Sequence, residues 1–154
     1  RVLVGEWALA GASSAGRKAG YGAGELGAVL AVIAETVVPD DKEQIQRAIR
    51  EQIAKGAHLV LTTGGTGVAP RDVTPEAVKE IADRELPGFG EVMRMESMKI
   101  TKNAILSRNL AAAVGNALVI CLPGKPKGAV ECLGFVEGAI PHCVEVVAGV
   151  PTSC

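Results

Sequence analysis

The chain contains the run His58-Leu59-Val60-Leu61-Thr62-Thr63-Gly64-Gly65-Thr66-Gly67, in which a compact apolar strand passes directly into a glycine-rich loop. A short, continuous apolar run is typical of a strand that is buried on both faces of a sheet. Glycine has no Cβ, so the loop backbone can turn sharply and approach a ligand closely. In open α/β sheets, ligands bind where strands end in such loops. The run therefore predicts an α/β domain with a binding loop at Gly64 to Gly67.

Strand and helix patterns alternate on the N-terminal side of this run. Asp40 and Glu43 have the spacing of a capping box, and isoleucines then recur on one helical face until Gly56. This pattern predicts a helix that begins at Asp40. The other elements expected here are a strand at Val2 to Val4, a loop over Ala10 to Gly24, a helix over Glu25 to Ala34 and a strand over Thr36 to Val38.

The alternation continues on the C-terminal side. Thr74-Pro75-Glu76 predicts a helix with Thr74 as its cap and proline in its first turn. We expect a helix over Met93 to Lys99, a strand over Ala117 to Leu122, and a helical segment over Lys127 to Val147 that breaks near Pro141. Strands separated by helices predict a three-layer α/β/α sandwich with a mostly parallel sheet, in one domain over residues 1–154.

Composition narrows the functional classes. With 154 residues, 48% of them hydrophobic, the chain has enough apolar surface for one core. The 16 Lys and Arg nearly balance the 17 Asp and Glu, so no overall field favours nucleic acid or an anionic membrane. No apolar run reaches the roughly 20 residues of a membrane span. We therefore expect a cytoplasmic protein with neither a nucleic-acid nor a membrane partner.

The four cysteines do not have the spacing of a metal site. Cys121, Cys132, Cys143 and Cys154 are eleven residues apart, and none forms a close pair with another. The first three lie in apolar stretches. We therefore expect packing or unreactive thiols rather than a zinc site or a set of disulfides.

The glycine loop and the residues after it could form an anion site. Several backbone N–H groups can converge at Gly64 to Gly67 beside the hydroxyls of Thr62, Thr63 and Thr66, which suits a phosphate or a heterocycle. The alternative is a plain tight turn. Arg71-Asp72 favours the site, since a carboxylate near bound phosphate can hold Mg²⁺, although Asp72 could instead cap the next helix.

Two further strand ends should reach the same edge of a parallel sheet. Asp40 and Asp41 follow the strand that stops at Pro39, and the turn Pro123-Gly124-Lys125-Pro126 follows the strand at Ala117 to Leu122. Lys125 and Lys127 are possible phosphate partners. The alternative for the aspartates is structural, with Asp40 capping a helix and Asp41 interacting with the helix dipole.

These residues also carry a resemblance to a known family. Four segments are similar to the signature of the molybdopterin-binding family typified by bacterial MogA and by the G domains of plant and gephyrin proteins. They are Thr62-Thr63-Gly64-Gly65-Thr66-Gly67, Arg71-Asp72-Val73-Thr74-Pro75-Glu76-Ala77, Leu106-Ser107-Arg108 and Leu122-Pro123-Gly124-Lys125-Pro126. The similarity extends from about Val37 to Cys143, and Pro87 to Arg94 resembles the MogA branch.

The resemblance implies a molybdopterin adenylyltransferase, which transfers AMP from Mg-ATP to the molybdopterin phosphate and releases pyrophosphate. It implies an α/β/α fold, usually assembled as a homotrimer. The family's two essential aspartates fall on Asp40 and Asp72, which would position Mg²⁺ and the nucleotide. The residues that would contact molybdopterin are Thr63, Gly64, Gly65, Thr66, Gly67, Ser97, Ser107, Pro123, Gly124 and Pro126.

Two other functions are compatible with the same sequence. One is a non-catalytic molybdopterin-binding domain, acting as a scaffold or as a module fused to, or partnered with, a molybdenum insertase. The other is a relative from the MoaB branch of molybdenum or tungsten cofactor synthesis. The segment Leu9 to Gly24 favours the binding domain, because Ala8-Leu9 stands where the family commonly has Ser-Asp and Arg17-Lys18 occupies the loop. The aspartate pair favours the enzyme.

Overall fold

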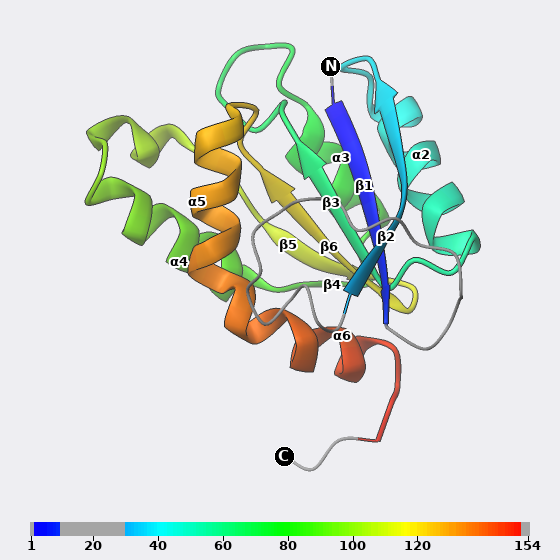
Figure 1. Cartoon of the computed structure of the whole chain (residues 1–154). Helices are drawn as coiled ribbons and strands as arrows, with labels where there is room; N and C mark the ends of the chain where they lie inside the picture. Colours follow the sequence, from blue (N-terminus) through cyan, green and yellow to red (C-terminus); the bar gives the residue numbers. More distant parts are fainter. Residues whose placement is uncertain (1, 10–29, 152–154) are drawn as a thin grey trace.

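A computed structural model describes residues 2–9 and 30–151 of the chain. The described strands form one six-stranded sheet in the order β2-β1-β3-β6-β5-β4 (Figure 1). Their bounds are β1 Val2–Leu9, β2 Leu30–Val38, β3 Leu59–Thr63, β4 Arg84–Glu85, β5 Ala111–Val114 and β6 Ala117–Leu122. The central strands β3, β5 and β6 are buried almost throughout.

Helices cover both faces of this sheet, as the three-layer prediction requires. The helices are α2 Lys42–Ala54, α3 Thr74–Ile81, α4 Pro87–Met98, α5 Pro126–Val136 and α6 Ile140–Val147, with short 3₁₀ turns η1 Lys102–Leu106 and η2 Glu137–Ala139. Figure 1 shows α2 and α3 on one side of the sheet and α4, α5 and α6 on the other. The α/β/α architecture is therefore confirmed.

The two faces of the sheet build two separate hydrophobic clusters. Because successive strand residues point to opposite faces, Val60 and Val119 pack with α2 and α3, whereas Leu61 and Ile120 pack with α4, α5 and α6. Ile49 of α2 and Met93 of α4 are fully buried in the respective layers. This double packing fixes the orientation of the strands whose ends carry the candidate site.

Strand register brings three loops to one edge of the sheet. β1 is antiparallel to both β2 and β3, and β3 is parallel to β6, so β2, β3 and β6 run in the same direction. Val2 pairs with Val38, its neighbour Leu3 pairs with Thr63, and Thr63 pairs with Leu122. The chain consequently leaves the sheet after β2, β3 and β6 at the same edge, as expected from the sequence.

The expectation of a mostly parallel sheet was wrong. Among the pairings of the described strands, only β3 with β6 is parallel, and the other four are antiparallel. One cause is the tight hairpin between β5 and β6, in which Gly115 adopts the left-handed conformation with φ of 59°. The sequence analysis missed β5, since its run Ala111-Ala112-Ala113 lacks the β-branched residues typical of strands.

Several local predictions are corrected by the structure. The helix expected over Glu25 to Ala34 is wrong for its last residues, because β2 begins at Leu30, and its earlier part lies outside the described residues. The loop Ala10 to Gly24 also lies outside them. The cap of α2 is Asp41 rather than Asp40: its side chain accepts the backbone N–H of Gln44 at 3.0 Å.

Other expected elements are confirmed in outline. Gly56 follows the end of α2 with φ of 100°, and the C-terminal helical segment is divided by η2, just before Pro141. α3 has proline in its first turn, but Val73 is its N-cap and no side chain caps it.

Cys121 and Cys132 are buried, and burial raises the pKa of the Cys121 thiol to about 12. No helix within the described ranges is long and apolar enough to span a bilayer.

Candidate functional site

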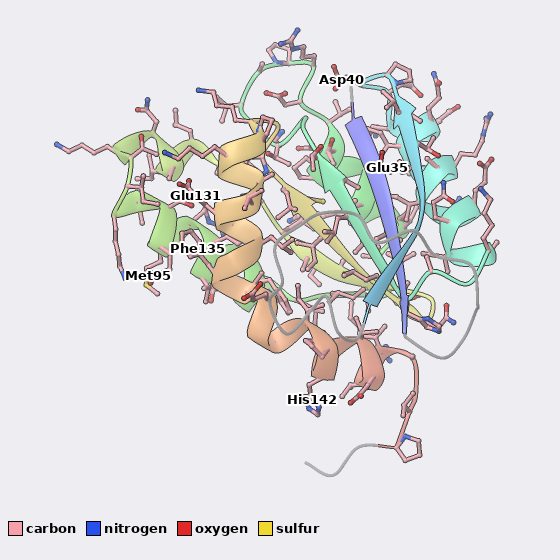
Figure 2. All side chains as sticks on the ribbon, in the orientation of Figure 1. Glu35, Asp40, Met95, Glu131, Phe135 and His142 are labelled. Carbon is pink, nitrogen blue, oxygen red and sulfur yellow. The ribbon has the colours of Figure 1, made fainter. Side chains whose placement is uncertain are left out.

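The loops at the shared sheet edge line a cleft of about 840 Å³. Most of the residues that the sequence analysis selected line it, namely Asp40, Gly65, Thr66, Gly67, Asp72, Ser97, Ser107, Pro123 and Gly124. Thr63, Gly64 and Pro126 do not line it, although Gly64 and Pro126 are next in sequence to residues that do. Asp40 lies just beyond the end of β2, whereas His142 on α6 lies at the opposite end of the molecule (Figure 2).

The glycine loop needs its glycines for two different reasons. Gly64 and Gly65 have φ of 99° and 64°, a backbone conformation that side chains disfavour. A Cβ on Gly65 would lie 2.3 Å from Thr74 Oγ1, and one on Gly124 would lie 3.1 Å from Gly64 Cα. The loop after β3 therefore packs backbone to backbone against the loop after β6. A side chain at Gly65 or Gly124 would therefore crowd its neighbour at the base of these loops.

Asp72 sits directly beside this glycine loop. Its Oδ2 accepts the backbone N–H of Ala69 at 2.9 Å, and a Cβ on Gly67 would lie 2.7 Å from that same oxygen. The carboxylate thus closes the turn that precedes α3 and does not cap the helix, since the cap is Val73. Its position in the cleft is compatible with the metal role that the sequence analysis gave it.

Asp40 and Asp41, although adjacent, have different roles in the structure. Asp41 is exposed and caps α2, so its carboxylate is committed to the helix. Asp40 is half-buried and lines the cleft. Asp40 and Asp72 therefore bring two carboxylates to one cavity from loops that are 32 positions apart in sequence. Magnesium in phosphate-processing sites is commonly held by one or two carboxylates together with phosphate oxygens, so this donor set fits Mg²⁺.

The described residues contain no cluster of three or more His, Cys, Asp or Glu side chains able to hold a metal on their own. A cation at Asp40 and Asp72 would thus depend on ligands from a bound nucleotide or from water. Basic groups are also at hand, because Arg71, Lys125 and Lys127 line the same cleft. Carboxylates, cations and glycine backbone in one cavity are the groups expected around a metal-bound phosphate ester.

Arg108 ties the glycine loop to the Asp72 loop, a role that the sequence analysis did not assign. Its Nε donates to the carbonyl oxygen of Gly67 at 2.7 Å, and its guanidinium also donates to the carbonyl oxygen of Asp72 and to the carboxylate of Glu76. Its own backbone N–H donates to the carbonyl oxygen of Thr66 at 2.9 Å. A single side chain thus fixes both ends of the segment that carries Asp72.

Asn109 and Cys132 also line the cleft, and the sequence analysis assigned neither of them to the site. Asn109 Nδ2 lies 3.6 Å from Cys132 Sγ, and Ser97 Oγ lies 3.5 Å from the same sulfur. The Asn109 side chain is 2% exposed. Burial raises the pKa of Cys132, so the thiol is neutral at pH 7. The only available signal was the position of Asn109 two residues after Ser107.

The ion pair between Glu76 and Arg108 should make stability depend on pH. Burial raises the pKa of Glu76, but the backbone N–H at the start of α3 and the Arg108 guanidinium outweigh it, so the pKa lies below its ordinary value of 4.5. A lowered pKa in the folded state stabilises the protein above the ordinary pKa, and this contribution is lost as the pH falls through the folded value.

We therefore expect wild-type protein to exceed Glu76→Gln in free energy of unfolding at pH 7, with the gap shrinking below pH 4.5. Urea unfolding of both proteins between about pH 7 and pH 3 measures the gap. A gap that stays constant over this range would show that the carboxylate charge does not matter.

Gly65→Ala should destabilise the protein more than a strained backbone alone explains. Positive φ at an alanine costs about 1 kcal/mol, and overpacking adds about 1–3 kcal/mol. Gly56→Ala is the matched control: Gly56 also has positive φ, but a Cβ there would meet no atom within 4 Å. Thermal or urea unfolding should show the larger loss for Gly65→Ala, partly recovered by adding Thr74→Ala. Equal losses at the two glycines would contradict the close contact with Thr74.

The chain is similar to a known protein family over most of its length. Residues 23–142 match the family described as "Probable molybdopterin binding domain". The chain is 47% identical over 114 residues to the molybdopterin adenylyltransferase of Helicobacter pylori strain J99, an alignment that covers 73% of this chain and 65% of that relative. The chain thus spans just under two thirds of the length of that relative.

Two further similarities extend the comparison. The chain is 42% identical over 112 residues to the molybdenum cofactor synthesis protein cinnamon of Drosophila melanogaster, covering 72% of this chain but 19% of the relative. The matched segment is therefore a small part of that longer protein. Among solved structures, the molybdopterin biosynthesis enzyme MoaB of Thermus thermophilus is 45% identical, with a TM-score of 0.68 over 75% of this chain and 74% of the other.

Proposed function

The chain belongs to the family of molybdopterin-binding domains, and from this premise we propose that it is a molybdopterin adenylyltransferase. In this reaction a phosphate oxygen of molybdopterin attacks the α-phosphorus of ATP, and pyrophosphate leaves. The observation that carries the proposal is that Asp40 and Asp72 line the same cleft as the glycine loop. A domain that only bound the pterin would have no need of two carboxylates beside its phosphate.

The glycine loop and the serines are proposed to bind the acceptor substrate. Gly65, Thr66 and Gly67 line the cleft, and their backbone N–H groups can donate to the terminal phosphate of molybdopterin, whereas the Gly64 N–H already donates to the carbonyl oxygen of Leu122. Ser97 on α4 and Ser107 after η1 line the same cleft, and the Ser107 hydroxyl is buried without a hydrogen-bond partner among the described residues. Such an unsatisfied hydroxyl is costly unless a ligand completes it.

Asp40 and Asp72 are proposed to hold the nucleotide end of the site. Both carboxylates would bind Mg²⁺ with the phosphates of ATP, and the ion, when bound, neutralises charge on the transferring phosphate. Arg71, Lys125 and Lys127 provide further positive charge along the cleft, and they suit the phosphates that leave as pyrophosphate. The role of the protein is thus to align the two substrates for in-line attack.

The proposal extends to location and assembly. ATP is a cytoplasmic substrate, so we place the reaction in the cytoplasm. We propose a homotrimer, and a molybdenum insertase as the partner that receives the adenylylated pterin, either as a separate protein or as a domain of the same chain. The short match within the much longer cinnamon protein supports a domain arrangement of this kind. The similarity to MoaB supports a second candidate function, which is the same chemistry in a relative from the MoaB branch of molybdenum or tungsten cofactor synthesis.

The test is release of pyrophosphate from ATP that requires the pterin. Protein, MgATP and molybdopterin should release pyrophosphate, and leaving out molybdopterin or removing Mg²⁺ with EDTA should abolish the release. Pyrophosphate released without molybdopterin would indicate a simple nucleotide hydrolase. Binding of molybdopterin without any pyrophosphate would indicate a binding domain.

A further inference from the structure

Asn109, two residues after Ser107, brings a carboxamide with an unpaired oxygen to the cleft, as judged among the described residues. Asn109 lines the cleft and is 2% exposed, and its Oδ1 is one of the buried side-chain oxygens with no hydrogen-bond partner among the residues that the structure describes. Leaving a buried amide oxygen unpaired destabilises a protein by about 1–3 kcal/mol. An oxygen of this kind in a ligand cleft is explained if a donor on the ligand completes it.

The position of this amide is fixed from two sides. The Asn109 backbone carbonyl accepts from Arg94 Nη1 of α4 at 2.6 Å, and a Cβ on Gly90 would lie 2.5 Å from the same carbonyl oxygen. On the other side, Nδ2 lies 3.6 Å from Cys132 Sγ of α5. Because Nδ2 already has a neighbour, Oδ1 is the group left to accept a hydrogen bond. These contacts hold the backbone and the amide nitrogen of Asn109 in place.

The Ser107 hydroxyl is a second unsatisfied group in the same short segment. Ser107 and Asn109 are two residues apart, both line the cleft, and Ser107 Oγ is also buried without a partner among the described residues. Arg108 between them is turned to the glycine loop, where it donates to Gly67. Ser107 and Asn109 therefore form a pair of polar groups that a flat heterocycle with several edge donors and acceptors can satisfy together.

We infer that Asn109 is a specificity-determining residue whose Oδ1 accepts a hydrogen bond from the amino-substituted edge of the pterin ring. This inference rests on the proposed function and names the part of the substrate that the cleft reads. A pterin carries an exocyclic amino group at C2 and an N–H at N3, both donors. Lumazine, which is otherwise similar, carries a carbonyl oxygen at C2, and this oxygen would repel Oδ1.

The experiment compares pterin and lumazine as inhibitors of molybdopterin-dependent AMP transfer, with direct binding followed by ligand fluorescence. Wild-type protein should bind pterin about tenfold more tightly than lumazine, because pterin donates a hydrogen bond to Oδ1 whereas the C2 oxygen of lumazine is repelled by it. Leucine has a volume similar to that of asparagine and no polar side-chain atoms. Asn109→Leu should therefore raise KM for molybdopterin by about tenfold with little change in kcat, and should abolish the preference for pterin over lumazine. Asn116→Leu, at the exposed β5–β6 turn, is the matched control and should behave as wild type.

Thermal unfolding of the free proteins separates binding from structure. Removal of an unpaired buried oxygen should leave Asn109→Leu no less stable than wild type, whereas a purely structural asparagine would lose stability. A less stable variant that keeps the preference for pterin would therefore overturn the inference.

The failures of the two proposals are distinguishable. Wild-type protein that transfers AMP but does not distinguish pterin from lumazine would overturn the inference alone, and this readout does not depend on a variant that folds. Wild-type protein that neither binds pterin nor transfers AMP would overturn the proposed function, and the inference with it.

Discussion

Asp72→Asn should lower kcat for AMP transfer by about 10³-fold while leaving KM for molybdopterin within about threefold. The amide keeps the shape of the side chain and an oxygen that can still accept the N–H of Ala69, so the turn beside Gly67 should survive. What is lost is the negative charge that would hold a cation against the nucleotide phosphates. Steady-state kinetics with molybdopterin and MgATP, together with titration of molybdopterin alone, separate the two effects.

The chain provides a close control for this prediction in Asp41→Asn. Asp41 is a carboxylate near the same sheet edge, but it caps α2 through the backbone N–H of Gln44, and asparagine is an equally good cap. This variant should keep wild-type kcat, whereas Asp40→Asn should fall with Asp72→Asn. Turnover of Asp72→Asn within about tenfold of wild type would rule out its assignment to the metal.

Arg108→Met should lower both stability and activity. Methionine keeps the apolar stem but removes the donors to the Gly67 and Asp72 carbonyls and to the Glu76 carboxylate. The side chain is one-third exposed, so we expect a loss of about 2–3 kcal/mol in free energy of unfolding rather than the cost of a fully buried ion. Displacement of the loop that carries Asp72 should cost about 10²-fold in kcat/KM.

Urea unfolding at pH 7 and steady-state kinetics measure these two losses. Arg50→Met, on the exposed surface of α2, removes a guanidinium far from the loops and should change neither quantity measurably. An Arg108→Met protein with wild-type kcat/KM would contradict the view that this side chain positions the Asp72 loop.

Much of the candidate site could be predicted from the sequence because the decisive signals are local. The strand before Gly64 and the strand before Pro123 are continuous apolar runs, and glycine or proline ends each of them. The prediction that these strands and the strand before Asp40 end at one edge assumed a mostly parallel sheet, whereas only the pairing of β3 with β6 is parallel among the described strands. The inference still holds, since two antiparallel steps through β1 return β2 to the direction of β3.

The features that sequence reasoning missed depend on long-range contacts or on shifts of one residue. The capping pattern at Asp40 and Glu43 could not distinguish Asp40 from Asp41, and only the structure shows that Asp41 accepts the Gln44 N–H. β5 is made largely of alanines and is a strand because its neighbours bury it. Asn109 acquires its meaning from Arg94 and Cys132, which lie on two different helices.

The central claim is that the cleft joins AMP to molybdopterin. The most direct measurement incubates the protein with molybdopterin, Mg²⁺ and ATP labelled at the α-phosphate, and then separates the pterin fraction. The account predicts that label appears in the pterin fraction, in equal amount to the pyrophosphate released, and that Asp72→Asn incorporates label about 10³-fold more slowly. Molybdopterin that binds tightly to wild-type protein but never acquires the label would contradict it.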